Sequence, residues 1–270
     1  MTTPCGDIWA SVRAIREQAP VIHNITNYVV MNTTANALLA LGASPVMAHA
    51  ENEMKDMVGI ASALVLNLGT LSDPWIRAMF KAATRARERG IPIVLDPVGA
   101  GATPYRTQAS QELIAAVPPT IIRGNASEIR AVVGEEGQTK GVDSTAASEQ
   151  ALMAARILHE RSGSVVCVSG AIDYIVGAGK AFAVANGHPL MTRVTGLGCT
   201  ASSLCGAFAA VGGDDAVAAA AQAMVVMGIA GELAAGKSAG PGTLQLHFFD
   251  TLYGLTEKDI TEGARVRHEA

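Results

Sequence analysis

A glycine-rich turn carries the most specific chemistry in this sequence. Residues 195–200 are Thr-Gly-Leu-Gly-Cys-Thr and stand directly before an alanine-rich stretch of helical character. Gly196 and Gly198 let backbone N–H groups approach a ligand without an obstructing Cβ, and a helix start adds unpaired donors and the positive end of its dipole. Such a turn could stabilise the charge of a phosphoryl group in transfer. An ordinary tight turn before a helix is the alternative for a bare Gly-x-Gly.

Cys199 stands at the first turn of the helix that follows. The helix dipole lowers the pKa of a thiol there, whereas the charge of a nearby nucleotide would raise it, so the residue types leave the net sign open. Cys167 and Cys205 are embedded in apolar sequence and are expected to be structural. Cys199 alone has the setting of a reactive site.

A carboxylate follows the apolar run at residues 91–95. Residues 96–99 are Asp-Pro-Val-Gly, which puts Asp96 at the ligand-facing end of a buried strand. A hard oxygen ligand there could hold magnesium, directly or through water, against nucleotide phosphates. Asp-Pro is also a common opening of a turn, and the two interpretations are compatible.

Another strand end, at residues 120–123, leads into Gly-Asn-Ala-Ser-Glu at residues 124–128. The forked guanidinium of Arg123 suits nucleotide phosphates. Glu128 has two interpretations. It could be a magnesium-linked carboxylate, or it could partner Asn125 in a helix capping box, which the spacing of three residues favours.

Three further places have weaker signals. Ser169 closes a predicted strand and offers a hydroxyl to the nucleotide, although a plain strand end explains it nearly as well. Polar side chains gather at residues 23–28, including Asn27, where turn formation and helix capping are their usual roles. Met47 could line a flat heteroaromatic substrate, although core packing is the commoner role of a methionine, and His49 beside it is explained as a satisfied polar residue.

These residues need a framework that brings strand ends together. Short β-branched runs alternate with helical stretches through the first two thirds of the chain. Strands are predicted at residues 45–47, 63–68, 91–96, 120–123 and 164–169, and helices at 74–89, 108–116 and 145–161. This alternation predicts a parallel sheet covered on both faces, with ligands at the carboxyl ends of its strands.

The pattern changes after Ser169. Residues 174–176 and 181–185 predict an antiparallel edge hairpin. Helix is predicted over about 199–236 and 244–253, and the polar tail that follows is expected to fray. Residues 1–270 are expected to form a single domain of α/β class.

Composition excludes several classes of protein. The formal net charge is −4 and the basic residues are scattered, so no nucleic-acid partner is expected. The four cysteines have neither zinc-type spacing nor the density of a disulfide-stapled domain, and no signal peptide is recognisable, so a cytoplasmic location is expected. The apolar stretch 216–235 is expected to be a buried core helix rather than a membrane span, because it is alanine-rich and preceded by capping aspartates.

Five segments together resemble the motif series of the hydroxyethylthiazole kinases in order and spacing. They are His-Asn-Ile-Thr-Asn (23–27), Pro-Val-Met-Ala-His-Ala (45–50), Asp-Pro-Val-Gly (96–99), Gly-Asn-Ala-Ser-Glu (124–128) and Thr-Gly-Leu-Gly-Cys (195–199). The resemblance extends from about residue 23 to residue 253. Five motifs in register are far more specific than any one of them.

The resemblance implies a ribokinase-like α-β-α sandwich without a lid, assembled as a homotrimer with thiazole sites between subunits. It implies magnesium-dependent transfer of the γ-phosphate of ATP to the primary hydroxyl of 4-methyl-5-(2-hydroxyethyl)thiazole, a step of thiamine biosynthesis and salvage. Residue roles follow by matching positions. Met47 and Gly196 would contact the thiazole, with Asn27 at the border of its pocket. Arg123 and Ser169 would contact ATP. Asp96 and Glu128 would form the acidic magnesium and phosphate region.

Cys199, with Gly196 and Gly198, would form the catalytic turn. Most ribokinase-like kinases have an aspartate base at the position of Cys199. Since a loose phosphoryl-transfer transition state needs little early deprotonation of the alcohol, our hypothesis is that Cys199 orients the hydroxyl more than it removes the proton. Ser169 stands where threonine is commoner in the family, and the hydroxyl is retained.

Three alternatives remain at this stage. A ribokinase-like hydroxymethylpyrimidine kinase is disfavoured by Cys199 and by the 23–27 segment. A nucleotide-dependent dehydratase of hydrated nicotinamide cofactors shares the fold. A non-catalytic nucleotide-binding module is disfavoured by the intact Asp96, Glu128 and glycine turn.

Overall fold

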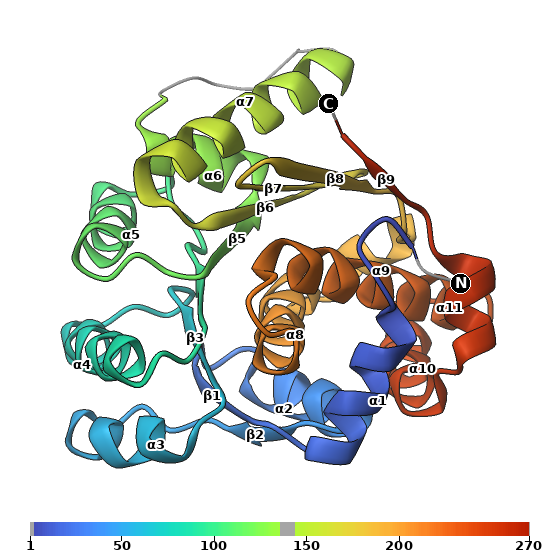
Figure 1. The fold of residues 1–270 in the computed structure, drawn as a ribbon, viewed down its shortest axis with the longest axis horizontal. Coiled ribbons are helices and arrows are strands. Elements are labelled where there is room, and N and C mark those ends of the chain that lie inside the picture. The colour runs from blue at the N-terminus through green and yellow to red at the C-terminus, as the bar shows by residue number, and fades with distance from the viewer. Residues whose placement is uncertain (1–2, 136–143, 270) are drawn as a thin grey trace.

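The computed structural model describes residues 3–135 and 144–269, and a nine-stranded sheet forms the centre of this described part (Figure 1). Its strands are β1 (Val21–Ile25), β2 (Ser44–Val46), β3 (Ala63–Asn67), β4 (Ile93–Asp96), β5 (Ile121–Asn125), β6 (Val165–Ser169), β7 (Asp173–Gly177), β8 (Lys180–Val184) and β9 (Val266–His268). They lie in the order β2-β1-β3-β4-β5-β6-β7-β8-β9. Neighbours pair in parallel from β2 to β6 and antiparallel from β6 to β9, which confirms the predicted mostly parallel sheet.

Helices cover both faces of the sheet, so the protein has three layers (Figure 1). One face carries α3 (Met54–Ile60), α4 (Asp73–Arg89), α5 (Pro104–Ala116), α6 (Ala126–Val133) and α7 (Ser144–Ser162). The other carries α1 (Ile8–Gln18), α2 (Met31–Leu41), α8 (Leu197–Val211), α9 (Ala216–Ala235), α10 (Pro241–Gly254) and α11 (Glu257–Gly263). Short 3-10 helices, η1 (Glu51–Glu53) and η2 (Pro189–Arg193), complete the described elements. A separate hydrophobic cluster lies between the sheet and each helical layer.

Strand β3 illustrates why the central strands are continuous apolar runs. Ala63 and Val65 belong to one hydrophobic cluster, whereas Leu64 and Leu66 belong to the other. Because successive side chains alternate between two buried faces, no polar alternation can appear in the sequence. The five strands predicted from such runs and the three helices between them are confirmed within a few residues.

In β3, β4 and β6 a polar residue stands at the carboxyl end of an otherwise apolar strand. Asn67 closes β3 directly opposite Asp96 on β4, and Asn125 closes β5 directly opposite Ser169 on β6. The parallel register therefore aligns four polar strand ends along one edge of the sheet.

Strand β1 was not among the predicted strands, because His23 and Asn24 interrupt its apolar pattern. Both side chains are fully buried. The Asn24 amide donates to the Ile22 carbonyl (2.8 Å) and its Oδ1 accepts from Ser203 Oγ (2.7 Å), while His23 Nε2 lies 2.9 Å from the Ala48 carbonyl. Partners from distant segments make a polar strand possible here.

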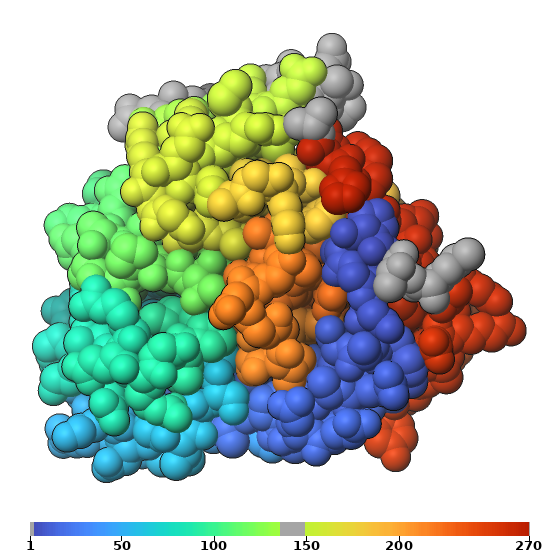
Figure 2. Space-filling view, in the orientation of Figure 1, coloured from blue at the N-terminus to red at the C-terminus, as the bar shows by residue number. Residues whose placement is uncertain are grey.

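The prediction that the polar tail frays is wrong. Residues after α10 form α11 and then β9, and β9 pairs with β8 and so lies outside the hairpin at the sheet edge. The ring of His268 packs on Phe182 with centroids 5.1 Å apart. Figure 2 shows the C-terminal part of the chain beside the N-terminal part. Helix α10, which precedes the tail, is held to α1 by Arg16, which donates to the carbonyls of Leu252 and Tyr253 (3.2 and 3.0 Å). Backbone pairing on a sheet edge, which composition does not reveal, orders this segment.

The helix predicted over residues 199–236 is two helices. The break falls at residues 212–215, where Gly213 has a left-handed φ of 61° and Asp215 Oδ1 caps α9 by accepting from Ala218 N (3.1 Å). Helix α9 is long and apolar enough to cross a membrane, yet 78% of its most apolar window is buried inside the protein. The prediction of a core helix is confirmed.

A glycine allows α9 to lie close to the segment that follows β8. A Cβ built on Gly228 would lie 2.6 Å from the backbone carbonyl carbon of Asn186. Gly59, inside α3, has no atom within 4 Å of the same Cβ position. The space around the two helical glycines therefore differs sharply.

We expect Gly228→Ala to destabilise the protein by about 1–3 kcal/mol, because the backbone must shift to accommodate the methyl group. Gly59→Ala is the matched control and should be neutral or stabilising by up to about 1 kcal/mol, since alanine favours helix. Urea denaturation of both variants measures the difference. Equal stability of the two would contradict this account of the packing.

Candidate functional site

A cavity of about 440 Å³ opens at the aligned strand ends. Eight of the nine residues singled out from the sequence line it, from segments up to 172 residues apart: Asn27, Asp96, Arg123, Glu128, Ser169, Gly196, Gly198 and Cys199. The ninth, Met47, lies just beyond β2 and does not line this cavity. The sheet register and the start of α8 bring the eight together.

The glycine turn is the N-terminus of α8. Gly196 has a left-handed φ of 84°, and a Cβ there would lie 2.5 Å from Val30 Cγ1, so both conformation and space require glycine. A Cβ on Gly198 would lie 3.0 Å from Arg123 Nη1. The turn is therefore tight. The N-terminus of α8 and the Arg123 side chain lie at the same cavity, and such a pair favours an anion.

Asp96 is a buried carboxylate, 1% exposed, at the end of β4. Its Oδ2 accepts from Ser202 Oγ (2.7 Å) and from Asn67 Nδ2 (2.9 Å). Burial raises the pKa of Asp96 to about 6, although the nearby Arg123 guanidinium opposes the shift. Both of these hydrogen bonds go to Oδ2, and no other described residue donates to Oδ1.

Asn67 is a site residue that the sequence did not reveal. Its Oδ1 accepts from Asn27 Nδ2 (2.8 Å) and from Gly69 N (3.0 Å), while its Nδ2 donates to Asp96. The side chain thus joins three parts of the cavity wall. A strand ending in Leu-Asn gives no motif, and only the pairing of Asn67 with Asp96 across β3 and β4 could have indicated it.

The Cys199 thiol lies 3.5 Å from Asn27 Nδ2, which donates to it. Burial, and then the negative charge of Asp96, raises the pKa of Cys199 to about 11. The residue types left the direction of the Cys199 pKa shift open. The shift is upward, because desolvation and a buried carboxylate outweigh the hydrogen bonds from Asn67 and Asn27. The thiol is neutral at physiological pH.

Arg123 is a buried cation that faces the cavity, 8% exposed. Its Nη2 donates to Ser169 Oγ (2.7 Å), whereas its buried Nε has no hydrogen-bond partner among the described residues. Burial alone would lower the pKa of Arg123, but Asp96 and other nearby acidic groups raise it overall, so the guanidinium stays charged. An incompletely paired buried guanidinium favours an anionic ligand.

Glu128 forms the capping box that its spacing indicated. Its Oε2 accepts from Asn125 N and Asn125 Oδ1 accepts from Glu128 N, both at 2.9 Å. Its Oε1 accepts from Gly99 N (2.9 Å), which fastens the loop after β4. Both oxygens are thus already used by backbone donors, and a magnesium role for Glu128 remains a prediction.

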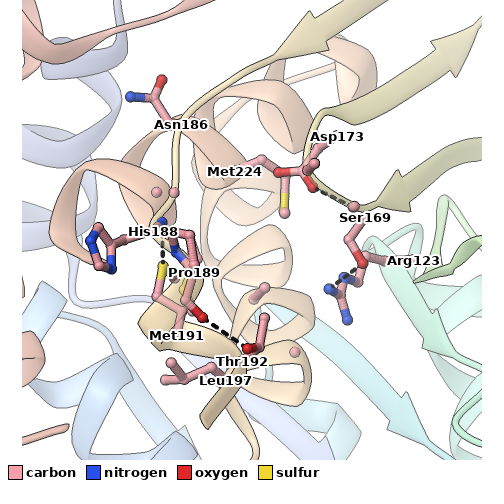
Figure 3. A pocket seen from close by; sticks show the side chains of 17 residues that line it. Arg123, Ser169, Asp173, Asn186, His188, Pro189, Met191, Thr192, Leu197 and Met224 are labelled. Atoms are coloured by element: carbon pink, nitrogen blue, oxygen red, sulfur yellow. Dashed lines mark hydrogen bonds between the residues drawn. The ribbon is translucent and has the colours of Figure 1, made fainter. Parts of the chain in front are cut away.

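A second cavity, of about 560 Å³, adjoins the first (Figure 3). The two cavities share Arg123, Ser169 and Gly198. Its walls are largely apolar, with Leu197, Met191, Met224 and Met227 among them. In the sequence the methionines of α9 were part of an apolar stretch interpreted as core, which is why this cavity was not anticipated.

Asp173 also lines the second cavity. Its Oδ1 accepts from Gly170 N (3.0 Å), which holds the turn between β6 and β7. Burial raises the pKa of Asp173 to about 6. Two adjoining cavities that meet at a guanidinium, a hydroxyl and a helix N-terminus can hold two ligands on either side of a phosphoryl group.

Comparison with known proteins agrees with this geometry. Residues 12–258 match the model of the hydroxyethylthiazole kinase family. A hydroxyethylthiazole kinase of Syntrophus aciditrophicus is 64% identical over 259 residues, 96% of each chain. The structure of the hydroxyethylthiazole kinase protein of Pyrococcus horikoshii OT3 superposes with a TM-score of 0.90 at 44% identity, covering 97% of this chain and 99% of that one.

A ribokinase-like superfamily protein of Enterococcus faecalis has the same fold, with a TM-score of 0.65 at 14% identity over 88% of this chain and 87% of its own. This likeness confirms the predicted ribokinase-like architecture. At that identity it says nothing about the ligand. The family match and the close relatives go further, and the chain belongs to the hydroxyethylthiazole kinase family.

Proposed function

We propose that this protein transfers the γ-phosphate of ATP to the primary hydroxyl of 4-methyl-5-(2-hydroxyethyl)thiazole, in thiamine biosynthesis and salvage. The observation that carries the proposal is the meeting of two cavities at Arg123, Ser169 and Gly198, beside the N-terminus of α8. Family membership supplies the identity of the alcohol. The chain would act as one kinase domain over residues 1–270, in the cytoplasm.

The two cavities have different chemistry, and we assign one substrate to each. The larger, apolar cavity with the methionines suits the base of ATP. The smaller one, with Asn27 and Cys199, would take the thiazole alcohol. The phosphates would then lie between Arg123 and the backbone N–H groups after Gly196, where a helix N-terminus stabilises negative charge.

Magnesium fits the residues at the strand ends. Asp96 has a carboxylate oxygen without a hydrogen bond among the described residues, beside the proposed phosphate position, and carboxylate oxygens are ligands that magnesium prefers. No cluster of three metal-binding side chains occurs in residues 3–135 and 144–269, which suits a cation held mainly by phosphates and water. When bound, the cation supplies positive charge to the phosphate oxygens. Glu128 would contribute to the magnesium site indirectly, by holding the loop after β4 through its hydrogen bond with Gly99 N.

Met47 lies outside the cavity, which supports a site shared between subunits of a homotrimer. Its side chain is partly exposed beyond β2. Next to Asn27, Tyr28 and Val29 are 64% and 62% exposed, an unusual setting for two apolar side chains at the border of a cavity. A neighbouring subunit would cover them and bring its own Met47 to the thiazole.

The neutral thiol fits an orienting role for Cys199. A thiol with a pKa of about 11 is a poor general base near pH 7, yet it can contact the substrate hydroxyl while Asn27 holds it in place. Positioning of the alcohol against a charge-stabilised phosphoryl group would then supply most of the rate enhancement.

Mass spectrometry of the purified protein with ATP, magnesium and an equimolar mixture of hydroxyethylthiazole and hydroxymethylpyrimidine tests the proposed function. We expect a phosphate mass gain on the thiazole alone, and its loss when a chelator removes magnesium. Phosphorylation of the pyrimidine alone, or of neither alcohol, would refute the assignment of the substrate.

Asp96→Asn should lower kcat by about 100-fold or more, because the negative charge of the carboxylate proposed to hold magnesium at the phosphate position is lost. Glu128→Gln is the matched control and should act mainly on stability, costing about 1–2 kcal/mol, because one of the two side-chain oxygens that accept from backbone N–H groups is lost. Steady-state kinetics and urea denaturation separate the two effects. If Glu128→Gln lowered kcat as much as Asp96→Asn at unchanged stability, Glu128 would be a ligand rather than a cap.

Cys199→Ala should lower kcat by less than about 100-fold, the lower bound for losing a positioned general base. In the wild type, the rate of Cys199 alkylation by iodoacetamide should keep rising with pH beyond 9, because the thiol stays protonated until near pH 11. Peptide mass spectrometry follows the modification. A clear gain in kcat for Cys199→Asp would show instead that base strength limits the reaction.

A further inference from the structure

Arg106 joins two loops at the active-site edge of the sheet without lining either cavity. It lies in the first turn of α5, which Thr103 caps by accepting from Arg106 N (3.3 Å). Its Nη1 donates to the carbonyls of Leu68 and Val98, and its Nη2 donates to the carbonyl of Gly69 (2.7 Å). One guanidinium thus binds the loop after β3 and the loop after β4.

These three carbonyls need hydrogen-bond donors, and a planar guanidinium can supply them. The chain leaves the sheet after Asn67 and Asp96, so the next carbonyls lose their ladder partners. Arginine presents several N–H donors in a rigid plane and can satisfy carbonyls from separate segments at once. The fit is close, because a Cβ on Gly99 would lie 3.0 Å from Arg106 Cδ.

Both loops that Arg106 holds form walls of the smaller cavity. Gly69, Thr70 and Val98 line it. Gly69 N also donates to Asn67 Oδ1, the atom that accepts from Asn27. The other side of the loop after β4 is fixed by Glu128 through Gly99 N. A shift of either loop would therefore move atoms of the cavity wall and the amide that contacts Cys199.

We propose that Arg106 is a positioning residue for the acceptor alcohol, acting through the loops at residues 68–71 and 97–102. This inference rests on the proposed placement of the alcohol in the smaller cavity. Loss of the guanidinium releases two walls of that cavity while the apolar walls of the larger cavity, on η2, α8 and α9, keep their contacts. Binding of the alcohol depends on this residue more than binding of ATP does.

Another arginine binds backbone carbonyls at the end of α3 and directly after it, away from the site. Arg89, at the end of α4, donates through Nη1 to the carbonyls of Val58 and Ala61 (2.5 and 2.6 Å). Ala61 precedes β3, so this contact lies at the opposite end of that strand from Gly69. Arg89→Ala removes a comparable loop contact without touching the cavity walls and is the matched control.

Steady-state kinetics of the wild type, Arg106→Ala, Arg106→Lys and Arg89→Ala, with hydroxyethylthiazole and ATP varied separately, tests the inference. We expect Arg106→Ala to raise the KM for the alcohol about tenfold or more and the KM for ATP by less than about twofold, since small displacements of positioning groups have large kinetic effects. The KM of Arg106→Lys for the alcohol should lie between those of the wild type and Arg106→Ala, because an ammonium group cannot reach all three carbonyls. Arg89→Ala should leave both KM values within about twofold of wild type.

Added guanidinium chloride at millimolar concentration should restore the alcohol KM of Arg106→Ala towards wild type and leave that of Arg89→Ala unchanged. If Arg106→Ala does not fold, Arg106→Lys carries the same KM comparison. The inference is overturned if the variants of Arg106 leave the alcohol KM unchanged, or if Arg89→Ala raises it equally. A wild type that phosphorylates no thiazole alcohol refutes the proposed function instead, before any variant is compared.

Discussion

The burial of the Asp96 carboxylate is the constraint on which the site depends. A carboxylate removed from water is costly unless hydrogen bonds and an opposite charge compensate for it. Here Ser202 on α8 and Asn67 on β3 donate to one of its oxygens, and Arg123 on β5 supplies the positive charge. These partners come from three elements, so satisfying one buried charge also fixes α8 and its glycine turn against the strand ends.

That arrangement sets the chemistry of its neighbours. The field of Asp96 adds to burial in keeping the Cys199 thiol protonated, and it adds to other acidic groups in keeping Arg123 charged. A neutral thiol and a permanent cation suit a reaction in which the alcohol is oriented and phosphoryl charge is neutralised. Asn67 couples these groups because it donates to Asp96 while accepting from Asn27, which in turn contacts Cys199.

Two charged side chains near the cavity, Glu128 and Arg106, form hydrogen bonds with backbone groups of the loops. Glu128 accepts from Asn125 N and Gly99 N, and Arg106 donates to three carbonyls of the same edge. Loops after parallel strands lose their ladder partners, and these two side chains replace them on opposite sides of the loop after β4. Side-chain hydrogen bonds thus hold loops that have no ladder partners of their own.

Most of the framework could be predicted from the sequence, because strands buried on two faces are largely apolar, and polar residues such as Asp96 and Ser169 mark where they end. The glycine turn was equally visible, since Gly196 needs a left-handed φ that few other residues adopt. Tertiary structure alone decided what depends on contacts between distant segments. It supplied the partners that let β1 carry buried polar residues, the sheet edge that ordered β9, and the burial that fixed the pKa of Cys199. The roles of Asn67 and Arg106 were likewise decided by tertiary structure, because they depend on the backbone and side-chain groups that the fold places beside them.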